Sequence, residues 1–209
     1  MESLAPISLK LPSKYASGKL STSDSTPSEP SVEWLTGTWT VTHSTLSMWR
    51  SARNVRISYK PLPPKADGRP RIDDLVEYEP TDKTAVRKTV QGVDTQAAAA
   101  GGTGETGAGG WDWRGKGWLF FVGSHWEVLG WGEETTAEGA RERWAVTWFA
   151  PTLFTKEGVD VYCDRREGLS EATYKRVEEA LRKLEAPPVV SMVDKDMRPV
   201  EIKLPWTEK

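Results

Sequence analysis

The sequence predicts an all-β fold, an eight-stranded antiparallel up-and-down barrel followed by one C-terminal α-helix. Eight segments rich in β-branched and aromatic residues follow one another along the chain, with turn residues and no long helical period between them. The one long helical pattern comes after the eighth segment. Strands joined in this way pair antiparallel, and closing eight of them into a barrel leaves no exposed sheet edge.

The first expected strand covers residues 36–43 and shows the clearest alternation. Thr and Val fit a pleated, half-buried surface, and the period of two places Trp39, Val41 and His43 on one face. Gly37 stands just before the first large ring, where a chain can bend sharply. We therefore expect the Trp39 face to point into the barrel.

The other seven expected strands are alternating or apolar runs that Gly, Pro, Ser or charged residues separate. In the second strand Ile57 and Tyr59 point inward, and Pro61 ends the run because proline cannot donate to a ladder. In the seventh strand Trp144 and Trp148 share one face. The seven segments are residues 54–60, 71–79, 84–93, 118–122, 125–131, 143–149 and 159–163.

The helical pattern begins after Ser170, a good N-cap residue, and Glu171 stands in the first turn, where the helix dipole favours an acid. Pro187 and Pro188 are expected to end the helix and residues 189–206 to be extended. The apolar stripe consists of Tyr174, Val177, Ala180, Leu181 and Leu184.

Three parts follow from this pattern. Residues 1–31 lack an apolar period and are expected to form a disordered tail. Residues 32–186 form the barrel and helix, with a flexible low-complexity insertion at 97–110. Residues 187–209 are expected to form an extended tail packed on the barrel.

Composition excludes several function classes. The net charge is −2 with both signs mixed, so no basic stripe indicates nucleic acid and no polybasic cluster indicates an anionic membrane. No stretch approaches the ~18 apolar residues of a membrane span, so we expect no membrane insertion. The single cysteine, Cys163, excludes an internal disulfide, and residues 1–14 lack the apolar core of a secretory signal. A reducing, cytoplasmic location is the expectation.

Gly37-Thr38-Trp39, eight strands and a helix after the last strand resemble the lipocalins and related calycin barrels, as a distant relative of the signal-less fungal type. The resemblance implies that Trp39 lies at the barrel floor and that the loop with Met48 and Trp49 partly closes the mouth. It also implies an arginine packed on Trp39, for which the chain offers Arg165, Arg166 or Arg198.

Tryptophan is the compositional outlier, with 11 residues. The rings either fill the barrel core or line an aromatic ligand pocket, since each buried indole removes roughly 150–250 Å² from water. The candidate ligand-binding residues are Trp39, Val41, Met48, Trp49, Ile57, Trp118, Phe120, Trp126, Trp144 and Trp148.

The candidate chemistry is sparse. His43 and His125 have no Cys or acidic pair at ligand spacing, so no metal site is expected. His43 is a hydrogen-bonded core histidine, a polar anchor or general acid/base in the cavity, or by analogy a haem ligand. Tyr59 would share the cavity as a donor, and Cys163 is interpreted as a buried thiol. No cofactor motif is present.

The sequence thus predicts a protein that binds a small hydrophobic molecule, aromatic, terpenoid or polyketide-like, in the barrel cavity. The alternative is an enzyme in the same cavity. Barrels of this type resemble cofactor-independent cyclases and isomerases, including pericyclases of fungal secondary metabolism. Such an enzyme would hold a flexible substrate in a reactive conformation, with His43 or Tyr59 hydrogen-bonding the developing charge.

Overall fold

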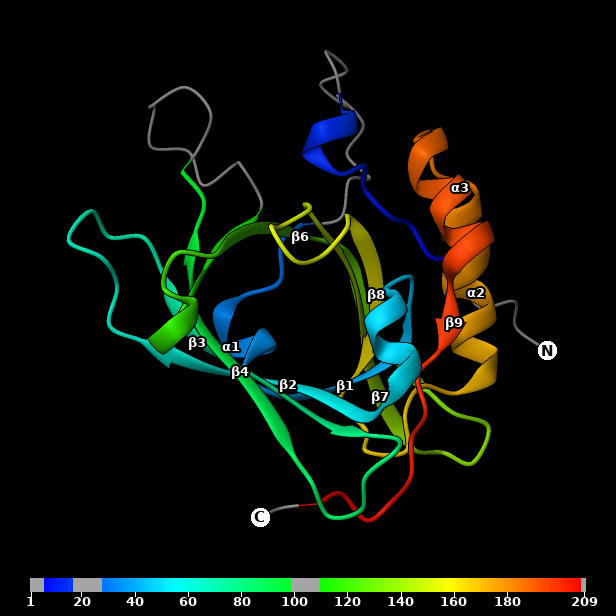
Figure 1. The fold of residues 1–209 in the computed structure, drawn as a ribbon. Coiled ribbons are helices and arrows are strands. Elements are labelled where there is room, and N and C mark those ends of the chain that lie inside the picture. The colour runs from blue at the N-terminus through cyan, green and yellow to red at the C-terminus, as the bar shows by residue number, and fades with distance from the viewer. Residues whose placement is uncertain (1–5, 17–27, 99–109, 208–209) are drawn as a thin grey trace.

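The computed structural model describes residues 6–16, 28–98 and 110–207. Eight strands form a closed antiparallel barrel, in which each strand pairs with the next and the last pairs with the first (Figure 1). This confirms the predicted fold class. The barrel strands are β1 Gly37–Ser44, β2 Ala52–Leu62, β3 Arg71–Pro80, β4 Lys88–Gln96, β5 Trp111–Gly115, β6 Gly123–Thr135, β7 Arg141–Phe149 and β8 Gly158–Cys163.

Helices and short elements complete the described chain. Two C-terminal helices, α2 Glu171–Arg182 and α3 Pro187–Asp196, lie side by side against the outside of β7 and β8 (Figure 1). A two-residue strand, β9 Arg198–Pro199, pairs with β1. The short helices are η1 Ser13–Tyr15, α1 Val32–Leu35, η2 Ser47–Ser51 and η3 Gly117–Leu119.

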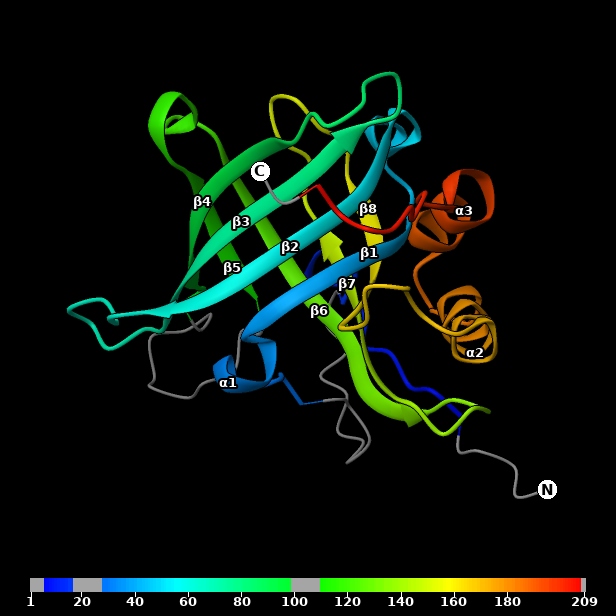
Figure 2. The ribbon, with the colours of Figure 1, turned by 90° about the horizontal axis from the view of Figure 1, so that it is seen from below.

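The barrel has two different ends (Figure 2). We call the end that carries α1 the floor and the opposite end the mouth. Because neighbouring strands are antiparallel, every second connection lies at the mouth. We call these four connections the mouth rim; they are residues 45–51, 81–87, 116–122 and 150–157.

Two apolar layers hold the fold together. The first fills the barrel and contains Trp39, Val41, Ile57 and Tyr59 among its members. The second lies between the barrel's outer surface and the C-terminal helices. Its helical side chains are Val177, Leu181, Val189 and Val193, and its strand side chains are Leu129, Trp144, Val146, Trp148, Val159 and Val161. The middle of each strand from β6 to β8 is therefore buried on both faces, one for each layer.

The fifth strand lies earlier than predicted, at β5 rather than at 118–122. In β5 the rings of Trp111 and Trp113 pack toward the interior, and the exposed Asp112 between them gives the alternation of a strand. The run after it turns at Gly117, whose φ of 60° suits glycine, and forms η3. A run of large apolar residues was mistaken for a buried strand.

A second helix replaces the extended segment predicted after Pro187. The two prolines occupy the first two positions of α3, where a missing N–H breaks no intrahelical hydrogen bond. They therefore begin a helix instead of only ending one. Val189 and Val193, one turn apart, then pack on the barrel beside α2.

The segment 6–16 packs against the barrel instead of forming a disordered tail. Ile7, Leu9 and Leu11 contact the outer apolar layer, and the Lys10 N–H donates to the Leu129 carbonyl at 2.7 Å. Residues 28–31 are also described, and they lead into α1. The rest of the expected tail, 1–5 and 17–27, lies outside the described residues, as does 99–109 of the expected insertion.

The C-terminal residues cross the outside of β2 and β3. The Lys203 N–H donates to Asn54 Oδ1 at 2.7 Å, and the Thr207 N–H donates to Glu79 Oε1 at 2.8 Å. The Trp206 ring covers the guanidinium of Arg56 at 4.8 Å. Polar outward-facing side chains of β2 and β3 are thereby buried with partners.

Candidate ligand site in the barrel interior

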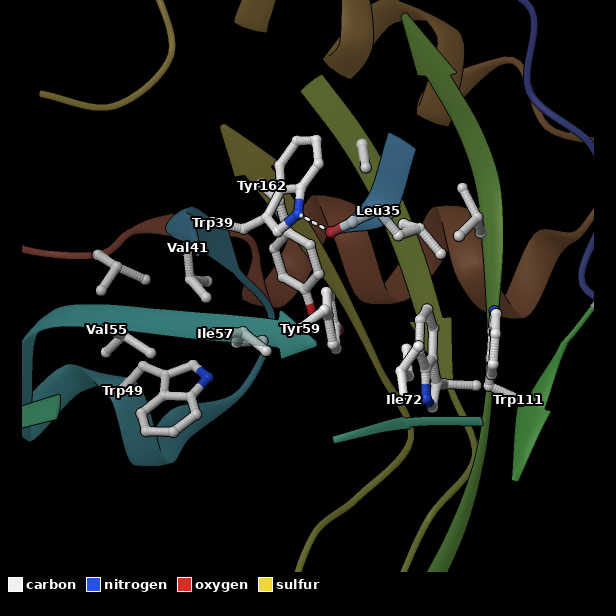
Figure 3. Close-up of a cluster of buried hydrophobic side chains, with 14 of the residues drawn as sticks. Leu35, Trp39, Val41, Trp49, Val55, Ile57, Tyr59, Ile72, Trp111 and Tyr162 are labelled. Atoms are coloured by element: carbon white, nitrogen blue, oxygen red, sulfur yellow. Dashed lines mark hydrogen bonds between the residues drawn. The ribbon is translucent and has the colours of Figure 1, made fainter. Parts of the chain in front are cut away.

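The floor is closed around Trp39. Its ring is fully buried, and its indole N–H donates to the Leu35 carbonyl of α1 at 2.8 Å (Figure 3). The guanidinium of Arg143 lies 4.9 Å from the Trp39 ring centre and 5.4 Å from that of Trp34. Asp164 accepts from Arg143 Nε at 2.8 Å and fixes this position.

The arginine on Trp39 is thus Arg143 of β7, and the candidates Arg165, Arg166 and Arg198 were wrong. Arg166 lies instead over Trp206, 4.7 Å from its ring centre, and Arg198 donates to the carbonyls of Lys195 and Met197 at the end of α3. The arginine comes from a strand beside the floor rather than from the segment after the last strand.

A stack of three aromatic rings spans the interior above the floor. Tyr59 of β2 stacks on Trp126 of β6 with ring centres 5.7 Å apart, and Trp126 stacks on Trp111 of β5 at 5.9 Å. The rings are nearly parallel, with interplanar angles of 12° and 17°. Figure 3 shows Tyr59 and Trp111 facing the interior from different strands, with Tyr162 beside Tyr59.

Three buried aspartates share the interior with these rings. Asp94 is fully buried, and its Oδ1 accepts the Trp126 indole N–H at 2.7 Å. Asp94 Oδ2 and Asp74 Oδ1 are buried and have no hydrogen-bond partner among the described residues. Asp160 accepts from Ser44 Oγ at 2.5 Å.

Burial shifts the titration of all three acids. It raises the pKa of Asp94 and of Asp160 to about 7, since a charge in an apolar interior is poorly solvated. The pKa of Asp74 is also raised, first by burial and then by the neighbouring charge of Asp94. Near neutral pH Asp94 and Asp160 can therefore donate a hydrogen bond when protonated or accept one when ionised.

The sequence pattern contained a signal for these acids. Asp74 alternates with Ile72 and Val76, which both pack on the interior core, and Asp160 alternates with the interior Tyr162. An acidic residue on the otherwise apolar face of a strand therefore predicts a buried acid inside the barrel.

His43 lies outside the barrel, contrary to prediction. The β1–β8 register shifts between Val41 and His43, and this bulge turns the histidine to the outer face. There its ring stacks on Tyr174 of α2, with ring centres 3.4 Å apart. Burial lowers its pKa to about 4, which fits a neutral packed histidine. It does not meet Tyr59.

The other predicted site residues divide by location. Trp144 and Trp148 lie in the outer layer because the smaller Ala145 and Thr147 take the inward positions of β7. Trp118, Phe120 and Met48 are exposed on the mouth rim, by 75%, 69% and 41%. The residues that the structure does bring together in the interior are Trp39, Val41, Trp49, Ile57, Tyr59 and Trp126.

Other candidate chemistry is limited. Within residues 6–16, 28–98 and 110–207, no group of three or more His, Cys, Asp or Glu side chains is placed to hold a metal ion. Cys163 is buried, as expected, and burial raises the pKa of its thiol to about 12. His125 contacts Asp112 at 2.9 Å and Glu127 at 3.4 Å on the outer face. In the described chain no helix is long and apolar enough to cross a membrane.

The architecture is lipocalin-like: a closed eight-stranded antiparallel barrel with a C-terminal helix packed outside it. No protein-family model matches the chain, and no curated protein matches it. Among solved structures the chain is similar to apocrustacyanin C2, with a TM-score of 0.47 and 10% sequence identity. That similarity covers 81% of this chain and 78% of the other.

Proposed function

We propose that this protein binds a small, largely apolar molecule, aromatic, terpenoid or polyketide-like, inside the barrel. The observation that supports this proposal is that the Tyr59, Trp126 and Trp111 stack shares the interior with buried acid oxygens that have no hydrogen-bond partner in the part of the chain that the structure describes. Small-molecule sites are mostly apolar and contain a few placed polar groups. The interior has this composition.

The acids add a requirement on the ligand. A buried polar atom without a partner costs roughly 1–3 kcal/mol, so a ligand that bonds Asp74 Oδ1 or Asp94 Oδ2 recovers free energy. With its pKa near 7, Asp94 donates to a carbonyl or ether oxygen when protonated and accepts from a hydroxyl when ionised. We therefore propose an apolar skeleton that carries at least one oxygen function.

The test is titration with the neutral fluorescent probe N-phenyl-1-naphthylamine, beside native mass spectrometry of the protein from its own source. We expect saturable binding that Trp111→Leu weakens about tenfold, because one face of the stack is lost. His43→Ala is the matched control, since its ring lies outside the barrel. Absence of saturable binding, or equal weakening by both variants, would overturn the proposal.

A cofactor-independent cyclase or isomerase is the second candidate, and Asp94 is the observation that favours it. A buried acid with a pKa near 7 beside aromatic rings suits a general acid that protonates a developing oxyanion while the rings hold the substrate's conformation. With the co-purified molecule identified, Asp94→Asn separates the two candidates. If the protein is an enzyme, Asp94→Asn lowers turnover about 10²-fold while binding is retained. If it is a carrier, neither the wild type nor the variant converts the bound molecule.

A further inference from the structure

The exposed large apolar side chains gather at one end of the molecule. Among the described residues seven such side chains are exposed, and all but Leu204 lie on the mouth rim. Trp118 and Leu153 are the most open, at 75% and 78% exposure. The six rim side chains are Met48, Trp118, Phe120, Phe121, Leu153 and Phe154. Scattered apolar residues on a surface are ordinary, but a gathered set marks a contact surface.

These side chains form a surface across separate loops. Phe121 contacts Phe120 edge-on, with ring centres 5.7 Å apart, and reaches Phe154 of the β7–β8 loop at 6.4 Å. Figure 2 shows the short helices η2 and η3, coloured cyan and green, on the same side of the barrel as the yellow β7–β8 loop.

The loops present these rings in fixed turns. In residues 116–122, Leu119 and Val122 are buried at 8% and 6% exposure, so the residues between and before them point outward. In residues 150–157, Thr152 Oγ1 accepts the N–H groups of Phe154 and Thr155, both at 3.0 Å. Anchored turns of this kind hold Trp118, Phe120 and Leu153 in solvent.

The rim is cationic although the chain is not. Lys83 and Lys156 are exposed and have no ion-pair partner among the described residues, while Arg50 donates to the carbonyls of Ser44 and Asp196. Lys116 pairs with Asp73 and Arg87 pairs with Glu77, two acids outside the rim, while the rim acid Glu157 pairs with Lys14. The rim contains five cationic side chains and two acids in a chain of net charge −2: Arg50, Lys83, Arg87, Lys116 and Lys156 against Asp82 and Glu157.

We propose that the mouth rim docks on the surface of an anionic phospholipid membrane. Exposed Trp, Phe and Leu side chains enter the boundary between headgroups and acyl chains, and lysines beside them are attracted to anionic lipid. The sequence has no polybasic run, because the fold collects these charges from four separate loops. If the interior binds an apolar ligand as proposed, docking places the mouth of the barrel against the lipid phase, in which such a ligand dissolves.

The experiment is co-sedimentation of the full chain, without ligand, with vesicles of pure phosphatidylcholine or of phosphatidylcholine with about one third phosphatidylglycerol. We expect about tenfold stronger partitioning onto the anionic vesicles at low salt, and loss of that preference when salt screens the charges. Replacing Phe120, Phe121 and Phe154 by Ser is expected to weaken partitioning at least tenfold on both vesicles.

Charge variants separate attraction from non-specific adsorption. Lys83→Glu with Lys156→Glu removes the anionic preference, whereas Lys65→Glu with Lys60→Glu at the floor end leaves it unchanged. Far-ultraviolet circular dichroism and melting temperature verify that each variant is folded. The proposal fails if the wild type does not sediment with anionic vesicles, or if the triple Phe variant sediments as strongly as the wild type. The rim would then be a candidate surface for a protein partner. Because no ligand is used, probe binding with no vesicle binding rejects this inference alone.

Discussion

At the residue scale, the contact between Arg143 and Trp39 is the interaction that closes the floor. Arg143→Met keeps the aliphatic stem but removes two cation–π contacts and leaves Asp164 without its guanidinium partner. We expect the free energy of unfolding to fall by about 2–3 kcal/mol in urea titrations. Arg198→Met removes a guanidinium whose hydrogen-bond partners among the described residues are the backbone carbonyls of Lys195 and Met197, and is expected to cost less than about 1 kcal/mol. Equal losses from both variants would contradict this account.

Residue patterns predicted the interior on regular strands that bury one face, and failed at a bulge and on a strand that buries both faces. Simple alternation placed Trp39, Val41 and Tyr59 inside correctly. One extra residue at the β1 bulge turned His43 outward, and no single-sequence pattern announces such a bulge. Both faces of β7 are buried, so alternation there does not say which face is inside, and Trp148 was assigned to the wrong layer.

At the element scale, the segment 6–16 acts as a strap across the outside of β6. Leu9 and Leu11 cover the outer apolar layer, and Ser13 donates its N–H and hydroxyl to the buried Glu127. Replacing Leu9 and Leu11 by Ser is expected to lower the free energy of unfolding by about 2–3 kcal/mol. Hydrogen exchange at the Lys10 amide should also become faster, because its bond to Leu129 is lost.

Pro6→Ser provides the control for the strap, since Pro6 is an exposed residue of the same segment. An unchanged melting curve for the Leu9 and Leu11 double variant would show that the strap adds nothing to stability. The composition of residues 1–31, dominated by Ser, Thr and Pro, hid the period-two pattern of Ile7, Leu9 and Leu11. The average composition of the long segment concealed a short ordered one, whereas seven of the eight barrel strands could be predicted from their own alternation.

At the scale of the whole molecule, the barrel interior couples stability to pH. The Asp160 carboxyl is buried with Ser44, and burial raises its pKa from 3.8 to about 7. Between these values the native state binds a proton that the unfolded chain has released, so the free energy of unfolding falls as pH rises. His43 has the opposite effect, because burial lowers its pKa from 6.5 to about 4. Between these values the unfolded chain binds a proton that the native state has released, so this contribution to the free energy of unfolding rises with pH.

Asp160→Asn separates these opposing effects, because the amide keeps an acceptor for Ser44 and cannot ionise. The variant retains His43 and every other titrating group, so their contributions cancel when it is compared with the wild type. We expect the stability of the wild type relative to the variant to fall by roughly 4 kcal/mol between about pH 4 and pH 8, and to level off above the folded pKa. Urea titrations of both proteins across this range measure the difference. A difference that stays constant with pH would mean that Asp160 is ionised or hydrated in the native barrel.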